Sequence, residues 1–237
     1  MIAPLQNGQP ADLCPLPQAA GALFEPGGAL AETQTHGFAY EARPQQLDMA
    51  RAVAEALEAN RHLVVEAGTG VGKSLAYLVP LILHAKRAQK RVMVSTHTIS
   101  LQEQLVGKDL PLLQDRLGVS FRAVLVKGRA NYLCLRRLAR ARAHPQDLFG
   151  IGIAEELEHI RAWADRTEDG SVQELRRQPS PDAWGAVCAE HGNCLGAKCP
   201  ERQRCFLMRA RARMHDADLL VANHHLLFSD LALRREG

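Results

Sequence analysis

The sequence predicts an α/β protein in which a parallel β-sheet carries a phosphate-binding loop and is interrupted by a cysteine-rich insertion. Three observations support this fold class. A glycine-rich turn at residues 68–72 lies between a β-branched run and an apolar helical stretch. Further short apolar runs alternate with helical segments, as is typical of parallel sheets. Three cysteines are grouped within the polar stretch 194–205, which suggests a metal site.

Length and composition allow one large domain, or one domain with an insertion. The chain has 237 residues, of which 46% are hydrophobic and 23% charged, and its net charge is +3. No Lys or Arg precedes Arg43, so the amino terminus lacks the basic start of a secretory signal. The longest apolar run, residues 75–83, is too short to span a bilayer. We therefore expect a cytoplasmic protein without membrane contacts, in which cysteines bind metal or act in catalysis.

The domain boundaries are predicted from changes in composition. A tail rich in Pro, Gly and Ala is expected to be flexible, and Trp163 and Trp184 are expected to give the insertion a small core. The predicted parts are the tail 1–35, the first part of the sheet domain 36–143, the insertion 144–215 and the return to the sheet domain 216–237. The predicted strands cover residues 62–66, 91–95, 121–126 and 219–222. Predicted helices begin near Pro44, Lys73, Ile99 and Pro111.

The glycine-rich turn has the residue pattern of a P-loop, with Ala67 in place of the usual first Gly. Glycines allow a tight turn in which several backbone N–H groups point at one anion, and the following helix adds the positive end of its dipole. Lys73 is expected to contact the β- and γ-phosphates, and the Ser74 hydroxyl is expected to bind Mg²⁺. Gln46, at the start of the preceding predicted helix, is in a position to read the edge of adenine.

The cysteines Cys194, Cys199 and Cys205 are spaced too widely for the Cys-x-x-Cys pairs of a zinc ribbon. An iron–sulfur cluster suits wider gaps, because each of its iron corners binds a separate thiolate. The fourth ligand is then either Cys134, which follows the third predicted strand, or Cys188, which is closer in sequence. Arginines flank these cysteines and either neutralise phosphates or form solvated helix faces: Arg136, Arg137, Arg140, Arg142, Arg209, Arg211 and Arg213.

In order along the chain, these motifs resemble the N-terminal part of the iron–sulfur DNA helicases of the DinG/XPD type, especially the DinG and YoaA branch. The resemblance covers about residues 38–230 and rests on segments 43–46, 66–74, 95–98, 127–134 and 221–224 and on the cysteine set. It implies a RecA-like P-loop NTPase motor domain that uses ATP and Mg²⁺, with a [4Fe–4S] cluster in the insertion. The implied nucleotide-binding residues are Gln46, Gly68, Thr69, Gly70, Val71, Gly72, Lys73 and Ser74, of which Lys73 and Ser74 are catalytic.

The same resemblance implies the other ligands and the activity. The implied cluster ligands are Cys134, Cys194, Cys199 and Cys205, and the implied DNA contacts are Thr96, His97, Thr98, Asn223 and His224. The activity would be ATP-dependent, 5′-to-3′ translocation on single-stranded DNA by a monomer that unwinds forked or branched duplex DNA. These helicases carry an Asp-Glu-Ala-His box soon after the Asn-His segment. No such box precedes Gly237, so we expect a truncated chain that is inactive alone.

Two alternatives of a different class stay open at this point. One is a P-loop kinase or ATPase with a structural zinc lobe, and metal analysis separates it from the helicase, since iron with sulfide supports the cluster. The other is a nucleotide- or DNA-binding module that does not hydrolyse ATP.

Overall fold

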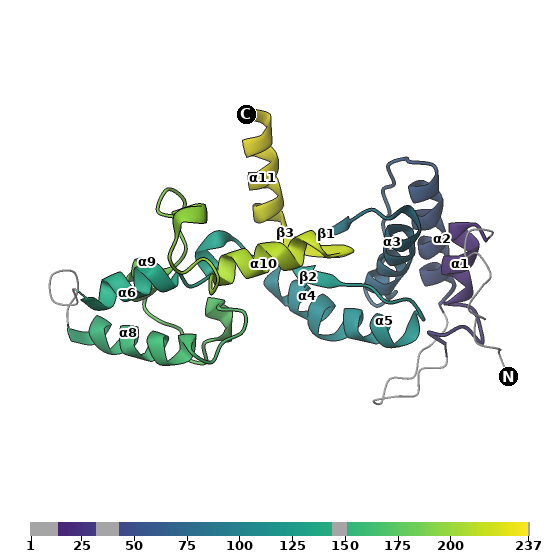
Figure 1. Ribbon diagram of the computed structural model, residues 1–237. Helices are drawn as coiled ribbons and strands as arrows, with labels where there is room; N and C mark the ends of the chain where they lie inside the picture. The colour runs from purple at the N-terminus through teal and green to yellow at the C-terminus, as the bar shows by residue number, and fades with distance from the viewer. Residues whose placement is uncertain (1–13, 32–42, 144–150, 237) are drawn as a thin grey trace. The chain divides into compact units, whose positions relative to one another are not determined.

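The computed structural model describes residues 14–31, 43–143 and 151–236, and the chain divides into two compact units (Figure 1). The first unit comprises Met1–Leu125 and Ala217–Gly237 and contains the sheet and the P-loop. The second unit, Val126–Asp216, contains every predicted cluster ligand and begins before the insertion expected at residue 144. Within the described ranges, no helix has the length and apolarity that a membrane span requires.

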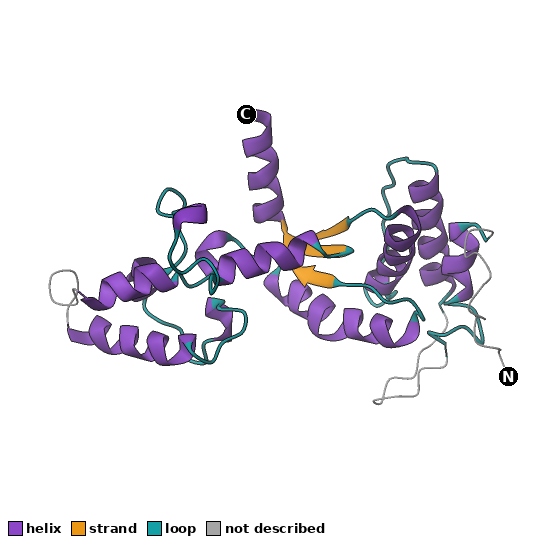
Figure 2. Ribbon diagram, in the orientation of Figure 1, coloured by secondary structure: helices purple, strands orange, loops and turns teal. Residues whose placement is uncertain are grey.

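The sheet of the first unit has three parallel strands, β1 (Val92–Thr96), β2 (Ala123–Leu125) and β3 (Leu219–Asn223) (Figure 2). Their order is β1-β3-β2, so the last strand in sequence lies in the middle. In the register of the ladder, Val92 lies opposite Leu219 and Thr96 lies opposite Asn223. Three of the four predicted strands are therefore confirmed, and the carboxyl ends of β1 and β3 lie at the same edge.

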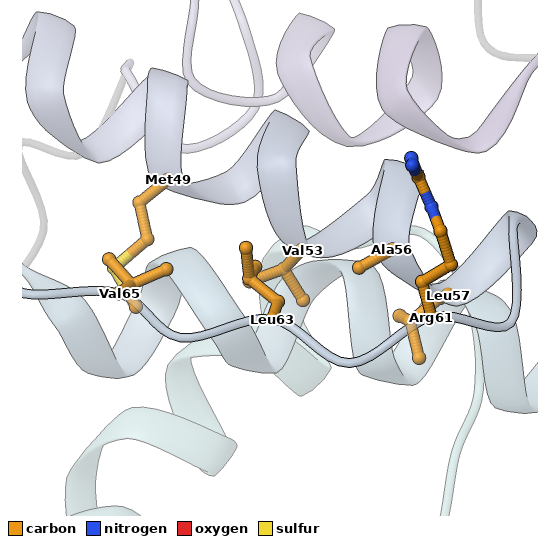
Figure 3. A pocket seen from close by; sticks show the side chains of 7 residues that line it. All are labelled: Met49, Val53, Ala56, Leu57, Arg61, Leu63 and Val65. Carbon is orange, nitrogen blue, oxygen red and sulfur yellow. The ribbon is translucent and has the colours of Figure 1, made fainter.

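The strand predicted over residues 62–66 is wrong, because this segment has no regular secondary structure. Leu63 and Val65 line a pocket beside α2 (Pro44–Glu58), together with Met49 and Val53 (Figure 3). Val64 is 96% exposed. The apolar run has the composition of a strand, but a strand needs a hydrogen-bonded neighbour, and the described residues supply none for this segment.

Three helices pack together in the first unit: α1 (Leu16–Ala22), α2 and α3 (Lys73–Ala88), with α2 in contact with both others. The flexible tail expected over residues 1–35 is therefore wrong for residues 14–31, while the rest of it lies outside the described residues. Leu16 and Ala20 are buried, because their spacing of four places them on one face of α1, and Phe24 is buried in the turn that follows this helix. The Pro-, Gly- and Ala-rich composition of this segment predicted flexibility, but its apolar side chains pack into the core of the first unit.

A continuous helical run follows β1. It consists of α4 (Ile99–Gln104), a π-helical turn (Leu105–Asp109) and α5 (Leu110–Arg116). The Thr98 hydroxyl caps α4 by accepting a hydrogen bond from the Leu101 N–H at 3.3 Å. The π-helical turn packs against α3. After β3, α11 (His224–Glu236) begins where the Asn223 side chain accepts a hydrogen bond from the Leu226 N–H.

The second unit contains α6 (Leu135–Ala143), α8 (Ile151–Ala164), α9 (Pro181–Val187) and α10 (Phe206–His215). Short 3₁₀ turns cover Arg129–Asn131, Val172–Glu174 and Gly196–Lys198. The unit has its own buried cluster, which includes Tyr132, Leu157 and Phe206. Trp163 packs edge-on against Trp184, with ring centroids 6.5 Å apart. The small core expected for the insertion is therefore present.

We expect Gly170→Ala to destabilise the second unit by about 2–3 kcal/mol. Gly170 has a positive φ of 66°, and an added Cβ would collide with the ring of Phe206, which is 2% exposed. The backbone cannot retreat freely, because the Gly170 carbonyl accepts a hydrogen bond from the Leu133 N–H at 2.9 Å. Urea unfolding followed by tryptophan fluorescence measures this unit, since both tryptophans of the chain lie in it.

The matched control is Gly185→Ala in α9, where the added Cβ would meet open space. This control should unfold at the same urea concentration as the unaltered chain or a higher one, because Ala favours a helix. Equal midpoints for the two variants would contradict the packing of Gly170 on Phe206.

Candidate functional site

The P-loop leads directly into the amino terminus of α3. Gly70 and Gly72 have φ values of 80° and 82°, a region that residues with side chains rarely adopt. Gly72 immediately precedes Lys73, the first residue of the helix. The first N–H groups of a helix have no partner inside it, and its dipole is positive at this end. The loop therefore has the backbone form of a phosphate site.

Two predicted nucleotide-binding side chains contact this loop. The Lys73 ammonium donates hydrogen bonds to the carbonyls of Ala67 at 2.9 Å and Gly68 at 2.6 Å. Gln46, on α2, is 2% exposed and donates from Nε2 to the Gly72 carbonyl at 2.9 Å. This contact brings α2 to the end of the loop, and a side chain at Gly72 would collide with the amide. The adenine contact of Gln46 stays a prediction.

A buried carboxylate that the sequence analysis did not single out lies next to Ser74. Asp109, at the end of the π-helical turn, is 8% exposed. Its Oδ2 accepts a hydrogen bond from Gln104 Nε2 at 3.2 Å. Burial raises the pKa of the Asp109 carboxyl, and the hydrogen bonds from Gln104 and Ser74 and the charge of Lys108 oppose this shift.

Asp109 has a signal in the sequence. It follows Leu105 by four residues and precedes Leu113 by four, and both leucines are fully buried. A carboxylate therefore occupies a core-facing position in an otherwise apolar helical face. Burial also raises the pKa of the phenol of Tyr77, one turn after Ser74, and a hydrogen bond from Ser74 opposes this shift.

The predicted DNA-contacting residues of the first unit gather at the carboxyl edge of the sheet. Thr96 lies opposite Asn223 in the ladder. Ser95 Oγ lies 2.7 Å from His224 Nδ1, and the rings of His97 and His224 are 6.0 Å apart at their centroids. Parallel pairing thus brings together residues that are more than 120 positions apart in sequence. Their contact with nucleic acid stays a prediction.

One cavity of the second unit is lined by all four predicted cluster ligands, Cys134, Cys194, Cys199 and Cys205. Cys188 does not line it. Leu133, which lines the cavity beside Cys134, faces Cys188 in an antiparallel bridge. Cys194 is exposed and the other three ligands are half-buried. Among the described residues, no three His, Cys, Asp or Glu side chains lie close enough to share a single metal ion.

Two arginines of α6 hold the loop that leads to Cys194. Arg137 donates to the carbonyls of Gly185 and Cys188, both at 2.8 Å, and pairs with Glu190 at 3.1 Å. Arg136 donates to the carbonyl of Asn193. Burial raises the pKa of the Cys188 thiol, and the charge of Arg137 opposes this shift. Both arginines also line the cavity of the four cysteines.

The other arginines near the cysteines divide into two groups. Arg142 pairs with Glu158 at 2.6 Å, and Arg213 pairs with Asp169. The side chains of Arg140, Arg209 and Arg211 are exposed, and none of the three forms one of these ion pairs, although the Arg209 guanidinium also lies 4.7 Å from the centre of the Phe206 ring. Because the first group serves contacts within the unit, the second group contains the better candidates for contacts with phosphate.

Comparison with known proteins agrees with this geometry. The DEAD/DEAH box helicase family model matches residues 47–151. The chain is 40% identical over 215 residues to the "ATP-dependent DNA helicase YoaA" of Escherichia coli (strain K12). The aligned residues make up 90% of this chain and 32% of that protein. It is 42% identical over 205 residues to the "ATP-dependent helicase DinG" of Mycobacterium tuberculosis (strain ATCC 25177 / H37Ra), which covers 79% of this chain and 31% of that protein.

A third relative carries a different name. It is the "3'-5' exonuclease DinG" of Bacillus subtilis (strain 168), 31% identical over 191 residues, which covers 81% of this chain and 20% of that protein. The chain thus spans at most about a third of the length of these relatives. It contains a DEAD/DEAH box helicase domain and is a homologue of the YoaA and DinG helicases.

Proposed function

We propose that this chain is the nucleotide-binding part of an ATP-dependent DNA helicase, which couples ATP hydrolysis to 5′-to-3′ movement on single-stranded DNA. The observation that carries the proposal is the P-loop, in which Lys73 lies against the loop carbonyls at the amino terminus of α3. The names of the YoaA and DinG relatives support ATP and DNA as substrates. Forked or branched duplexes and a monomeric state are part of the proposal.

In this proposal the triphosphate lies along the backbone of Gly68, Thr69, Gly70, Val71 and Gly72. The Lys73 ammonium has three N–H donors, and two of them donate to carbonyls of the loop. When a triphosphate is bound, its oxygens would accept from these N–H groups in place of the carbonyls. Ser74 would contact Mg²⁺, which neutralises negative charge on the β- and γ-phosphates when it is bound. Gln46 would contact the adenine base from the far end of the loop.

The second unit would hold a [4Fe–4S] cluster on Cys134, Cys194, Cys199 and Cys205. Support comes from the single cavity that these residues line and from their thiol chemistry, since iron–sulfur clusters are held by cysteine thiolates. Arg136 and Arg137 line the same cavity and would offset the negative charge of four thiolates. Bound there, the cluster supplies a crosslink between the amino terminus of α6 and the loops before α10.

Activity measurements on a chain extended to the length of the relatives test the helicase proposal. We expect ATP hydrolysis that single-stranded DNA stimulates, and separation of a forked duplex with a 5′ single-stranded tail. A matched duplex with only a 3′ tail is the control for direction and should stay intact. ATP hydrolysis without any response to DNA would instead support a P-loop ATPase of another kind.

For the same extended chain, Arg209→Gln/Arg211→Gln should weaken the salt dependence of binding to single-stranded DNA. Both side chains are exposed on α10. Each phosphate contact contributes about −0.7 to the slope of log K against log [salt], so the slope should change by about 1.4. Fluorescence anisotropy with a labelled oligonucleotide at several salt concentrations measures it.

The control for this pair is Arg176→Gln/Arg177→Gln, which removes the same charge from two exposed neighbours in the same unit. Its slope should match that of the unaltered chain. If both pairs change the slope equally, the effect is one of net charge and α10 is not a specific DNA contact.

A further inference from the structure

The side chain of Arg137 joins the helix that follows Cys134 to the end of another helix. Arg137 lies in the first turn of α6, three residues after Cys134. Its guanidinium donates to the carbonyls of Gly185 and Cys188, both at 2.8 Å. These carbonyls lie at the carboxyl end of α9, where the last carbonyls of a helix have no partner inside it. The Arg137 side chain is 19% exposed, so water competes little for these hydrogen bonds.

Further contacts continue from Arg137 to the residue that precedes Cys194. Glu190 Oε2 lies 3.1 Å from the Arg137 guanidinium and also accepts a hydrogen bond from Asn193 Nδ2 at 2.5 Å. Arg136, the neighbour of Arg137 on α6, donates to the Asn193 carbonyl. That carbonyl belongs to the peptide bond between Asn193 and Cys194. The peptide that carries Cys194 is therefore fixed to α6 by contacts on its side chain and on its backbone.

The two cysteines at the ends of this path are held in different ways. The Cys134 N–H donates to the Val187 carbonyl at 2.9 Å, so a backbone hydrogen bond fixes this residue. Residues 190–195, which include Cys194, form no helix or strand, and Cys194 is exposed. Both cysteines nevertheless line the same cavity. The place of Cys194 in that cavity thus rests on the contacts that the two arginines of α6 make with the preceding loop.

We propose that Arg137 is a positioning residue for Cys194, which fixes the preceding loop on α6 so that Cys194 faces the cavity shared with Cys134 before a cluster binds. This inference rests on the proposed [4Fe–4S] site, and Arg137 acts in it through Glu190 and Asn193. A guanidinium suits the role, because its five N–H donors lie in a fixed planar fork and can serve two carbonyls and a carboxylate together. A loop that is already ordered loses less conformational freedom when its ligand binds.

The rate of iron release from the loaded chain tests the inference. The chain is loaded with iron and sulfide in the absence of oxygen, and its visible absorbance is followed after a chelator is added in excess. We expect Arg137→Gln to lose its cluster about tenfold faster than the unaltered chain, the effect of one lost hydrogen bond to a charged group. Arg140→Gln removes the same charge from an exposed position of α6 and is the matched control, with an unaltered rate. Equal rates for the two variants would overturn the inference.

Arg137→Lys distinguishes position from charge. Lysine keeps the positive charge, but its ammonium lacks the planar fork, so this variant should release iron about as fast as Arg137→Gln. The electron paramagnetic resonance line shape of the reduced cluster should change in both variants, because a displaced Cys194 thiolate alters the geometry at its iron. Full rescue by lysine would mean that Arg137 only offsets the charge of the thiolates, and it would overturn the inference. An unchanged line shape in Arg137→Gln would do the same.

Asn193→Ala tests the same path at an exposed position, even if Arg137→Gln fails to fold. It removes the donor to Glu190 but keeps the carbonyl that Arg136 contacts, so iron release should be about threefold faster while the urea midpoint stays the same. Arg137→Gln/Asn193→Ala should release iron no faster than Arg137→Gln alone, because both changes act through Glu190. Additive effects, or an unaltered rate in Asn193→Ala, would overturn the inference. If the unaltered chain binds no iron with sulfide, the proposed cluster fails instead, and this outcome is distinct from the others.

Discussion

Lys73→Ala is expected to weaken the affinity of the chain for ATP about 100-fold, because it removes the cation that lies inside the P-loop. The ammonium contacts the carbonyls of Ala67 and Gly68, so it already lies where the loop closes around an anion. Titration with a fluorescent ATP analogue measures the loss. The fold should be retained, since the side chain is exposed and accepts no contact from a buried group: it donates to the backbone carbonyls of Ala67 and Gly68.

Lys90→Ala is the matched control for this measurement. Lys90 is exposed and follows the carboxyl end of α3, so its removal changes the net charge equally without touching the loop. Its affinity for ATP should equal that of the unaltered chain. An affinity for ATP that survives in Lys73→Ala would contradict the P-loop assignment, and a loss shared with Lys90→Ala would indicate binding by net charge alone.

Cys134→Ser is expected to abolish the iron–sulfur cluster, although Cys134 lies 60 residues before Cys194 in the sequence. It is one of the four cysteines that line the cavity, and serine is a poor substitute for a thiolate ligand. Purified without oxygen, the unaltered chain should contain about four iron atoms with equal sulfide, and the variant should lose them together with its visible absorbance. Zinc in place of iron would contradict the cluster and support a structural zinc lobe.

Cys188→Ser is the control, because Cys188 is the other cysteine at this end of the unit and is also half-buried. It should keep its iron, since Cys188 does not line the cavity that the four proposed ligands share. If Cys188→Ser loses iron and Cys134→Ser keeps it, the fourth ligand is Cys188 and the proposed set is wrong.

Local patterns in the sequence predicted much of the first unit. The run of glycines before Lys73 requires positive φ values, and Gly70 and Gly72 have them. Pro44 begins α2 as predicted, because proline suits the first turn of a helix. β1, β2 and β3 occur where short apolar runs predicted them. These features depend on a few neighbouring residues, so the sequence alone contains the information for them.

Features that depend on partners distant in sequence were decided only by the tertiary structure. Residues 62–66 carry a strand pattern but lack a ladder neighbour among the described residues, whereas Leu16 and Phe24 in the expected tail are buried by α2 and α3. Asp109 reaches Ser74 only because a π-helical turn packs against α3. The sequence by itself thus determined the P-loop and the set of candidate cysteines. Which cysteines share a cavity, and which carboxylate lies beside Ser74, depend on packing between distant segments, because no local pattern encodes which surfaces will meet.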